Sequence, residues 1–329
     1  MKNRSEKPIL LTGSTGFVGT HTARQLVDQG CRVRCLVRKT SDVSRLPSEA
    51  EQTVGHLMNY ESLKQAVKGC QAVIHVGGIV RARQPREFYL VNRDGTANLT
   101  KAAVEAGVGR FVLCSSQAAA GPSTPDRRRR WADPPNPVTE YGKSKLSGEE
   151  ALQKRAGDMW YCIIRPPAIY GPFDYGFYTL VRWIKWGFKL KLGAGKMPIA
   201  LIHVADLARV LTLALAANHP SGAVWFATDG GDHTLLEINA AIENALGKRA
   251  RWITIPEWVA PGIASVIELV AGISGGAALL SRNKLNELTQ PAWTCDDTPF
   301  REATGFKERF DLYTGWQDTV DWYRANGWI

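Results

Sequence analysis

The chain has 329 residues, 44% of them hydrophobic and 22% charged, which is typical of a globular protein large enough for a full core. Its six cysteines are scattered, without a CxxC pair or a His-rich spacing, and this argues against a disulfide framework and a metal site. The net charge of +10 favours anionic ligands.

The densest basic run, residues 127–130, lies among prolines and predicts an exposed loop. No aromatic interleaving or nucleic-acid-binding motif accompanies it, so we expect no nucleic-acid partner. Residues 1–7 are polar and contain no secretory h-region, so we expect a cytoplasmic protein.

An apolar run, residues 8–11, predicts a buried strand that ends in a turn with three glycines. Gly13 allows a sharp turn, Gly16 lets the backbone approach a pyrophosphate, and Gly19 lets the following helix pack closely. That helix, predicted over residues 17–30, offers the free N–H groups of its N-terminus to an anion. The spacing is GxxGxxG instead of GxGxxG, and the alternative is an ordinary glycine-rich turn.

Residues 31–38 alternate as a second strand, and Arg38 ends it about 20 positions beyond the glycines. An acidic residue at this place binds the ribose 2′-hydroxyl of NAD, whereas an arginine accommodates the 2′-phosphate of NADP. Lys39 follows, and no carboxylate occurs before Asp42, so the sequence favours NADP over NAD. The alternative is that Arg38 merely ends a strand at the surface.

Strands and helices then continue to alternate. We predict a strand that ends near residues 55–57, a helix over 60–68, a strand over 72–76, a helix over 87–106 and a strand over 110–114 that leads into Ser115 and Ser116. This alternation is typical of an α/β protein with a doubly wound parallel sheet, which binds ligands at the carboxyl ends of its strands.

Tyr141 and Lys145 lie four residues apart in a predicted helix that runs to about residue 154, and therefore share one helical face. A phenol has a pKa near 10, but a cation about 4 Å away lowers it by as much as about three at an effective dielectric near 20. This pair predicts general acid–base chemistry, and the alternative is a surface pair without function.

Together these residues resemble the short-chain dehydrogenase/reductase superfamily, specifically its extended branch, the NAD-dependent epimerase/dehydratase superfamily. Five motifs carry the resemblance, in the family's order: TGSTGFVG at 12–19 for TGxxGFxG, VNRDGTANL at 91–99 for VNxxGTxNL, YGKSK at 141–145 for YxxSK, RPPAIYGP at 165–172 for RPxxVYGP, and IHVADLA at 202–208 for IHVxDLA.

The resemblance implies a Rossmann-type domain over residues 1–170, to which 200–228 return, and a smaller, mostly helical substrate lobe over 171–329. It also implies that Tyr141 transfers the proton, that Lys145 lowers its pKa and holds the nicotinamide ribose, and that Ser116, in preference to Ser115, orients the reacting oxygen. The implied cofactor contacts are Gly13, Ser14, Thr15, Gly16, Phe17, Val18, Gly19, Arg38, Val76, Gly77, Tyr141, Lys145, Pro167 and Ile169.

Three departures from the family pattern bear on the ligands. The family often has aspartate where His56 and Asn59 stand, near the adenine. Its His-small-Ala-Ala loop here contains residues 77–78, both glycine, which predicts extra room over the cofactor. Relatives that act on nucleotide sugars usually carry an arginine where Ile199 stands, and its absence counts against such a substrate, although Lys196 is a nearby cation.

Residues 258–280 contain a single charge and are long enough to cross a bilayer, but a proline, a glutamate and several glycines interrupt them. We interpret them as the apolar lid of a substrate pocket. Core helices of the second lobe are the alternative, and peripheral membrane contact is the least favoured of the three.

Residues 115–122 look like the SSxxxAGP strand of the 3β-hydroxysteroid dehydrogenase group, and residues 33–38 look like the corresponding strand of dihydroflavonol reductases. The expected function is an NADP-linked interconversion of a ketone and a secondary alcohol on a largely apolar, sterol-like or flavonoid-like small molecule. The alternatives are a nucleotide-sugar epimerase or dehydratase with tightly bound NAD(P), and a non-catalytic dinucleotide-sensing protein. By resemblance alone, we expect a homodimer.

Overall fold

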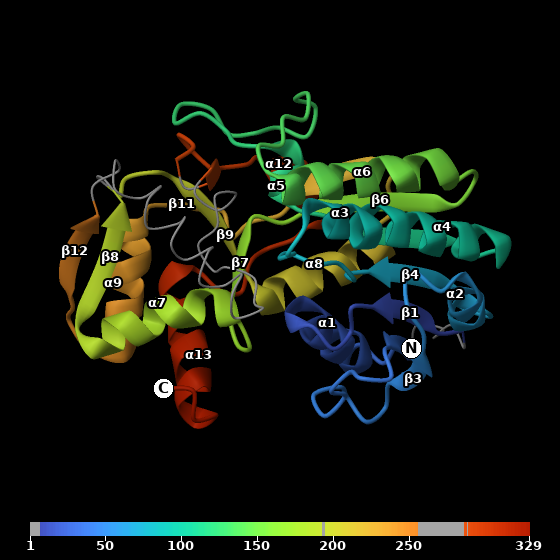
Figure 1. Ribbon diagram of the computed structural model, residues 1–329, viewed down its shortest axis with the longest axis horizontal. Helices are drawn as coiled ribbons and strands as arrows, with labels where there is room; N and C mark the ends of the chain where they lie inside the picture. The colour runs from blue at the N-terminus through green and yellow to red at the C-terminus, as the bar shows by residue number, and fades with distance from the viewer. Residues whose placement is uncertain (1–6, 193–194, 256–285, 288) are drawn as a thin grey trace.

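The computed structural model describes residues 7–192, 195–255, 286–287 and 289–329. Its centre is a parallel seven-stranded sheet with the order β10-β6-β5-β4-β1-β2-β3 (Figure 1). The chain adds β2 and β3 on one side of β1 and then returns to add β4 on the other side, so the expected doubly wound, Rossmann-type fold is confirmed. The strands are β1 (Ile9–Thr12), β2 (Val33–Val37), β3 (Glu51–Val54), β4 (Ala72–His75), β5 (Arg110–Cys114), β6 (Trp160–Arg165) and β10 (Ala223–Phe226).

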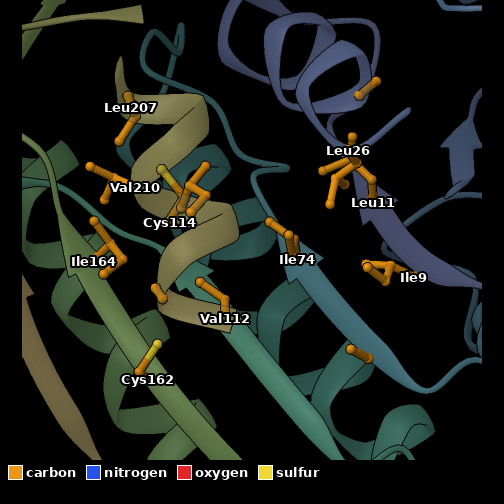
Figure 2. Packing of buried hydrophobic residues seen from close by; sticks show 14 of the residues in the cluster. Ile9, Leu11, Leu26, Ile74, Val112, Cys114, Cys162, Ile164, Leu207 and Val210 are labelled. Atoms are coloured by element: carbon orange, nitrogen blue, oxygen red, sulfur yellow. The ribbon is translucent and has the colours of Figure 1, made fainter. Parts of the chain in front are cut away.

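Helices cover both faces of this sheet, because successive side chains of each buried strand point to opposite faces. Ile9 and Leu11 of β1 join a cluster with α1 (Phe17–Asp28) and α8 (Val204–Ala216), as Figure 2 shows. Leu10, between them, packs with the opposite layer instead. That layer contains α2 (Tyr60–Val67), α4 (Gly95–Glu105) and α6 (Glu140–Arg155).

The helix that we expected over residues 87–106 is not continuous. It consists of α3 (Pro85–Phe88), a π-helical turn η1 (Tyr89–Asp94) and α4. Asn92 lies in the π turn, and the Thr96 hydroxyl donates to its carbonyl oxygen at 2.7 Å, a bond that competes with the regular backbone ladder. Single π turns of this kind are frequent at functional sites, and this one turns the Asn92 amide toward α6.

Among the described residues, the smaller second lobe contains three longer helices and two small sheets. Its core joins the helices to β7 (Ala168–Tyr170) through Tyr170, whose ring stacks on Trp316 at a centroid distance of 4.6 Å. The elements are β7 (Ala168–Tyr170), β9 (Ile199–His203) and β11 (Asp232–His233) in one sheet, β8 (Phe188–Leu192) and β12 (Arg251–Ile255) in the other, and the helices α7 (Tyr175–Trp186), α9 (Leu235–Leu246) and α13 (Leu312–Ala325).

Other sequence predictions concern the cysteines, the first helix and residues 258–280. All six cysteines are free thiols, as expected. The helix expected over 17–30 ends at Asp28, and Gly30 has a φ of +71°, a value that favours glycine. Residues 258–280, which we interpreted as a lid, lie outside the described residues. Within the described ranges, no helix combines the length and the apolar character needed to cross a membrane.

Candidate active site

The turn between β1 and α1 has no room for side chains at its glycine positions Gly13 and Gly19. Gly13 has a φ of +69°, and a Cβ atom there would lie 2.7 Å from the backbone nitrogen of Gly77. A Cβ atom at Gly19 would lie 2.0 Å from the carbonyl oxygen of Gly13, so the first turn of α1 packs directly on the turn before it. Ser14 is fully buried and its hydroxyl donates to the carbonyl oxygen of Leu36 at 3.2 Å, which ties the turn to β2.

The start of α1 fits the pyrophosphate of a dinucleotide. Gly16 is exposed at the N-cap, where no side chain hydrogen-bonds the free N–H groups, and the first turn contains no acidic residue. An anion at this place would receive these N–H groups and the positive end of the helix dipole. Thr15, Phe17 and Val18 are partly buried around the same turn. An NAD(P) cofactor would therefore be held by residues 13–19.

Arg38 and Lys39 follow β2 at the carboxyl end of the sheet, and both side chains are exposed. The backbone nitrogen of Arg38 donates to the Ser41 hydroxyl at 3.1 Å. Asp42, the nearest carboxylate in sequence, accepts a hydrogen bond from the Ser44 backbone at 2.9 Å, and its bonds to Ser44 lower its pKa. The strand end thus presents two exposed cations.

A buried chain of hydrogen bonds links the glycine turn to the π turn. Thr12 Oγ1 lies 2.5 Å from His75 Nδ1, and His75 Nε2 lies 3.1 Å from Thr96 Oγ1. Because Thr96 donates its proton to the Asn92 carbonyl, it accepts from Nε2, so Nε2 carries the imidazole proton and Nδ1 accepts from Thr12. Burial lowers the pKa of His75 to about 3, so the ring is neutral at pH 7.

Asn92 fixes the loop after β4 against α6. Its side chain accepts from the backbone nitrogen of Ile79 at 2.9 Å, donates to the Ile79 carbonyl at 3.0 Å, and donates to the Ser144 hydroxyl at 2.9 Å. A Cβ atom at Gly78 would lie 2.9 Å from Asn92 Oδ1, and one at Gly77 would lie 3.0 Å from Thr12 Oγ1. The extra room that we expected over the cofactor from these glycines is therefore taken by protein side chains.

Gly78→Ala is expected to destabilise the protein by about 1–3 kcal/mol, because the added methyl group overpacks the Asn92 amide. The quantity to measure is the free energy of urea unfolding. The matched control is Gly109→Ala, where the new Cβ atom lies no closer than 3.6 Å to a neighbour and φ is not left-handed. Equal stability of the two variants would show that the loop yields without moving Asn92.

The three predicted catalytic side chains come from neighbouring elements. Thr139 caps α6 by accepting from the backbone nitrogen of Gly142 at 3.1 Å. Gly142 allows α6 to approach the short helix α5 (Gln117–Ala120) closely, because a Cβ atom there would lie 2.3 Å from a carbonyl oxygen of α5. This approach places Tyr141 beside Ser116, whose hydroxyl also caps α5 by accepting from the backbone nitrogen of Ala118 at 3.1 Å.

The pKa of Tyr141 differs from our expectation. Burial raises the pKa well above its usual value of 10, and the neighbouring Ser116 hydroxyl opposes this shift only in part. Lys145 does not lower it here, since the ammonium group is itself buried, which lowers its own pKa, and it donates to the carbonyl oxygen of Cys114 at 2.8 Å. Tyr141 is therefore protonated at neutral pH, as a proton donor has to be.

Ser115, the less favoured candidate, faces a different set of partners. Its hydroxyl donates to the carboxylate of Glu149, which lies on α6 one turn beyond Lys145. Arg165 binds the same carboxylate in a bidentate pair, with Nη2–Oε2 2.6 Å and Nε–Oε1 3.0 Å, and both side chains are almost fully buried. This network joins the end of β5 to β6 and α6. It engages the Ser115 hydroxyl in the scaffold, whereas the Ser116 hydroxyl caps α5.

The remaining predicted residues line the loops at the same edge. Val76 is partly buried after β4, Pro167 is buried after β6, and Ile169 lies partly buried in β7. Asn59 is occupied locally, because its side chain accepts from the Ser62 backbone at 3.1 Å and caps α2. His56 Nδ1 accepts from the Met58 backbone at 3.1 Å in the same turn.

Sequence reasoning gave no role to His75, Asn92, Glu149 or Arg165. His75 was detectable as a polar side chain at the end of an apolar strand, and Asn92 as part of a matched motif. Among the described residues, no group of His, Cys, Asp and Glu side chains is arranged to hold a metal ion.

Comparisons with known proteins identify a family and a shared fold. The model of the NAD dependent epimerase/dehydratase family matches residues 9–225. Ceramide reductase of Caulobacter vibrioides is 34% identical over 326 residues, which are 98% of this chain and 96% of that protein. UDP-glucose 4-epimerase of Vibrio cholerae is 29% identical over 270 residues, 77% of this chain and 80% of that protein.

A solved structure shares the fold. The UDP-glucose 4-epimerase of Thermotoga maritima superposes with a TM-score of 0.80 over 97% of this chain and 99% of that chain, at 19% identity.

Proposed function

Because the chain belongs to the NAD dependent epimerase/dehydratase family of NAD(P)-dependent extended short-chain dehydrogenases/reductases, we propose that it interconverts a ketone and a secondary alcohol on a largely apolar molecule, with NADP as its cofactor. The observation that carries this proposal is the placement of the buried Tyr141 phenol beside Ser116, with the buried Lys145 one turn further along the same helix. A carbonyl oxygen placed between the two hydroxyls would receive two hydrogen bonds.

In the direction of reduction, Tyr141 gives its phenolic proton to the carbonyl oxygen, and Ser116 holds that oxygen in place. A nicotinamide cofactor held by residues 13–19 would supply the hydride that the carbonyl carbon accepts. The developing negative charge on the substrate oxygen is matched by the positive charge of Lys145, which has two further N–H groups besides the one that binds the Cys114 carbonyl. The ketone gains one hydride and one proton and leaves as a secondary alcohol.

Two observations favour an apolar substrate. Ile199 is a partly buried aliphatic side chain in β9, where nucleotide-sugar enzymes of the extended branch usually carry an arginine. The relative from C. vibrioides, a ceramide reductase by name, matches this chain along almost its whole length. A ketone on a long-chain lipid amide is therefore the first substrate class to test, followed by sterol-like and flavonoid-like ketones.

A nucleotide-sugar epimerase is the second candidate, since the V. cholerae relative carries that name. Turnover is measured as loss of reduced-nicotinamide absorbance with a 3-oxo long-chain lipid amide, a steroid ketone and a flavonoid ketone, and as sugar isomerisation with UDP-glucose. We expect NADPH consumption with at least one apolar ketone and no change in the sugar nucleotide. Isomerisation of UDP-glucose without response to any ketone would overturn the proposal.

The cofactor preference has a test of its own. Arg38→Asp is expected to weaken NADPH binding about 10- to 100-fold, the effect of losing a hydrogen bond to a charged group, while NADH binding changes little. Dissociation constants from nicotinamide fluorescence measure both. Arg155→Gln, an exposed cation at the end of α6, is the control. Equal weakening of NADPH and NADH would show that Arg38 does not discriminate the 2′-phosphate.

A further inference from the structure

The second lobe carries a small sheet with two unlike faces. β8 and β12 pair in parallel at the end of the molecule that lies opposite β3 in Figure 1, with Trp252 beside Lys189 and Ile253 beside Leu190. Lys189 is buried and its ammonium group lies 2.8 Å from Glu243 of α9, so this side of the sheet faces α9. Because side chains alternate along a strand, Leu190 and Ile253 belong to the opposite face.

This opposite face presents large apolar side chains to solvent. Ile253 is 49% exposed, and Trp186, at the end of α7, is 57% exposed. The Trp186 ring lies 6.4 Å from that of Phe188, the first residue of β8. An indole and a branched aliphatic side chain on one surface are more than the scattered single hydrophobic residues that a protein surface normally carries.

Cations surround these apolar side chains. Arg182, Lys185 and Arg251 are all exposed, and the guanidinium of Arg182 lies 4.5 Å above the Trp186 ring. Within the described ranges, no carboxylate forms an ion pair with Arg182, Lys185 or Arg251. Glu243, the acidic neighbour, is buried and bound to Lys189, and Arg249 lies 3.7 Å from it. We call Arg182, Lys185, Trp186, Arg251 and Ile253 the distal basic face.

We propose that the distal basic face docks on the surface of a bilayer that contains anionic lipids. Arginine and lysine attract anionic headgroups, and tryptophan is the side chain that settles at the level of the headgroups with its apolar body in the membrane. The proposal rests on the proposed function, because an enzyme for a long-chain apolar ketone meets its substrate in a membrane. The face lies on the substrate lobe and does not include residues 258–280, whose apolar composition is a separate feature of the sequence.

The arginine loop at 127–130 offers a contrast within the same chain. Arg127 lies 3.2 Å from Asp133, and Arg128 lies 2.8 Å from Asp232, so these cations are already neutralised by the protein. The distal basic face keeps its charges for an external partner, and that partner has to be anionic.

The test is co-sedimentation of the purified full chain with phosphatidylcholine vesicles, with and without phosphatidylglycerol. The face variant is Arg182→Gln/Lys185→Gln/Arg251→Gln. The matched control, Lys68→Gln/Lys154→Gln/Arg155→Gln, removes three exposed cations from the opposite end of the molecule. Trp186→Ala keeps every charge and tests the apolar contribution. NADPH binding, measured on each variant, reports that the nucleotide domain remains folded.

We expect the wild type to bind the anionic vesicles, to show no binding to the neutral ones, and to be released from the anionic vesicles by salt. The face variant is expected to bind about 100-fold more weakly, roughly fivefold for each cation, with an intermediate loss for Trp186→Ala and none for the control. Equal losses in the face variant and the control would overturn the proposal, because net charge alone would then drive binding. Failure of the wild type to bind anionic vesicles would overturn it as well.

A single-stranded RNA is the second anionic probe. Retention of RNA by the same residues, without vesicle binding, would assign the face to a different partner and overturn the proposal. Because vesicle binding needs no turnover, failure here leaves the ketone assay unaffected, and failure of the ketone assay leaves the vesicle result readable.

Discussion

Replacing Tyr141 by phenylalanine is expected to lower kcat for ketone reduction by about 10²- to 10⁴-fold, the contribution of a positioned general acid. The ring stays against Phe88, at a centroid distance of 6.1 Å in the wild type, and only the hydroxyl that meets Ser116 is lost. The dissociation constant for NADPH should change little, since the glycine turn is untouched. Steady-state kinetics and a fluorescence titration of NADPH measure the two quantities.

Tyr161→Phe is the matched control, because this tyrosine lies near the start of β6, at the opposite end of the strand from the catalytic residues. If Tyr141→Phe kept its kcat while Ser116→Ala lost activity, the proton would come from another group. Full cellular function of Tyr141→Phe would favour the third interpretation, a dinucleotide-sensing protein without catalysis.

Replacing Arg165 by methionine is expected to destabilise the protein by about 3–5 kcal/mol. The substitution leaves the Glu149 carboxylate buried without its bidentate partner, although the Ser115 hydroxyl still donates to it. A large part of the stability of a typical domain would be lost. Urea unfolding followed by circular dichroism measures the change.

The double variant Glu149→Leu/Arg165→Met should recover most of this loss, because an apolar pair of similar volume replaces a buried ion pair at little cost. Lys64→Met is the control for removal of an exposed pair with Glu61 and should change stability by no more than about 1 kcal/mol. A small effect of Arg165→Met would mean that water reaches Glu149 and that the network is not a dry support for the site.

The sequence predicted the fold well wherever one local rule decides the structure. The run of buried strands and the glycine turn follow from apolar patterning and from a turn that only glycine can make at Gly13. The prediction of one continuous helix over 87–106 was wrong in its middle, because a π turn depends on what the Asn92 side chain binds. Its partners, Ile79 and Ser144, are distant in sequence.

The site was harder to predict, because its electrostatics depend on burial. Tyr141 and Lys145 share a face as the spacing predicts, yet the depth of both groups decides their pKa values, and depth is set by α5, β5 and the loop at Gly78. The engagement of Ser115 by the buried pair of Glu149 and Arg165 was not predicted, because no spacing rule brings these three side chains together.

The most direct measurement of the proposed reaction follows the hydride. NADPH that carries deuterium at the transferable position is incubated with the ketone substrate, and the product is analysed by mass spectrometry. We expect one deuterium at the carbinol carbon of the alcohol and one oxidised cofactor for each product molecule. A product without deuterium, or a turnover with no net oxidation of the cofactor, would contradict the assignment and would instead indicate an epimerase that returns its hydride to the substrate.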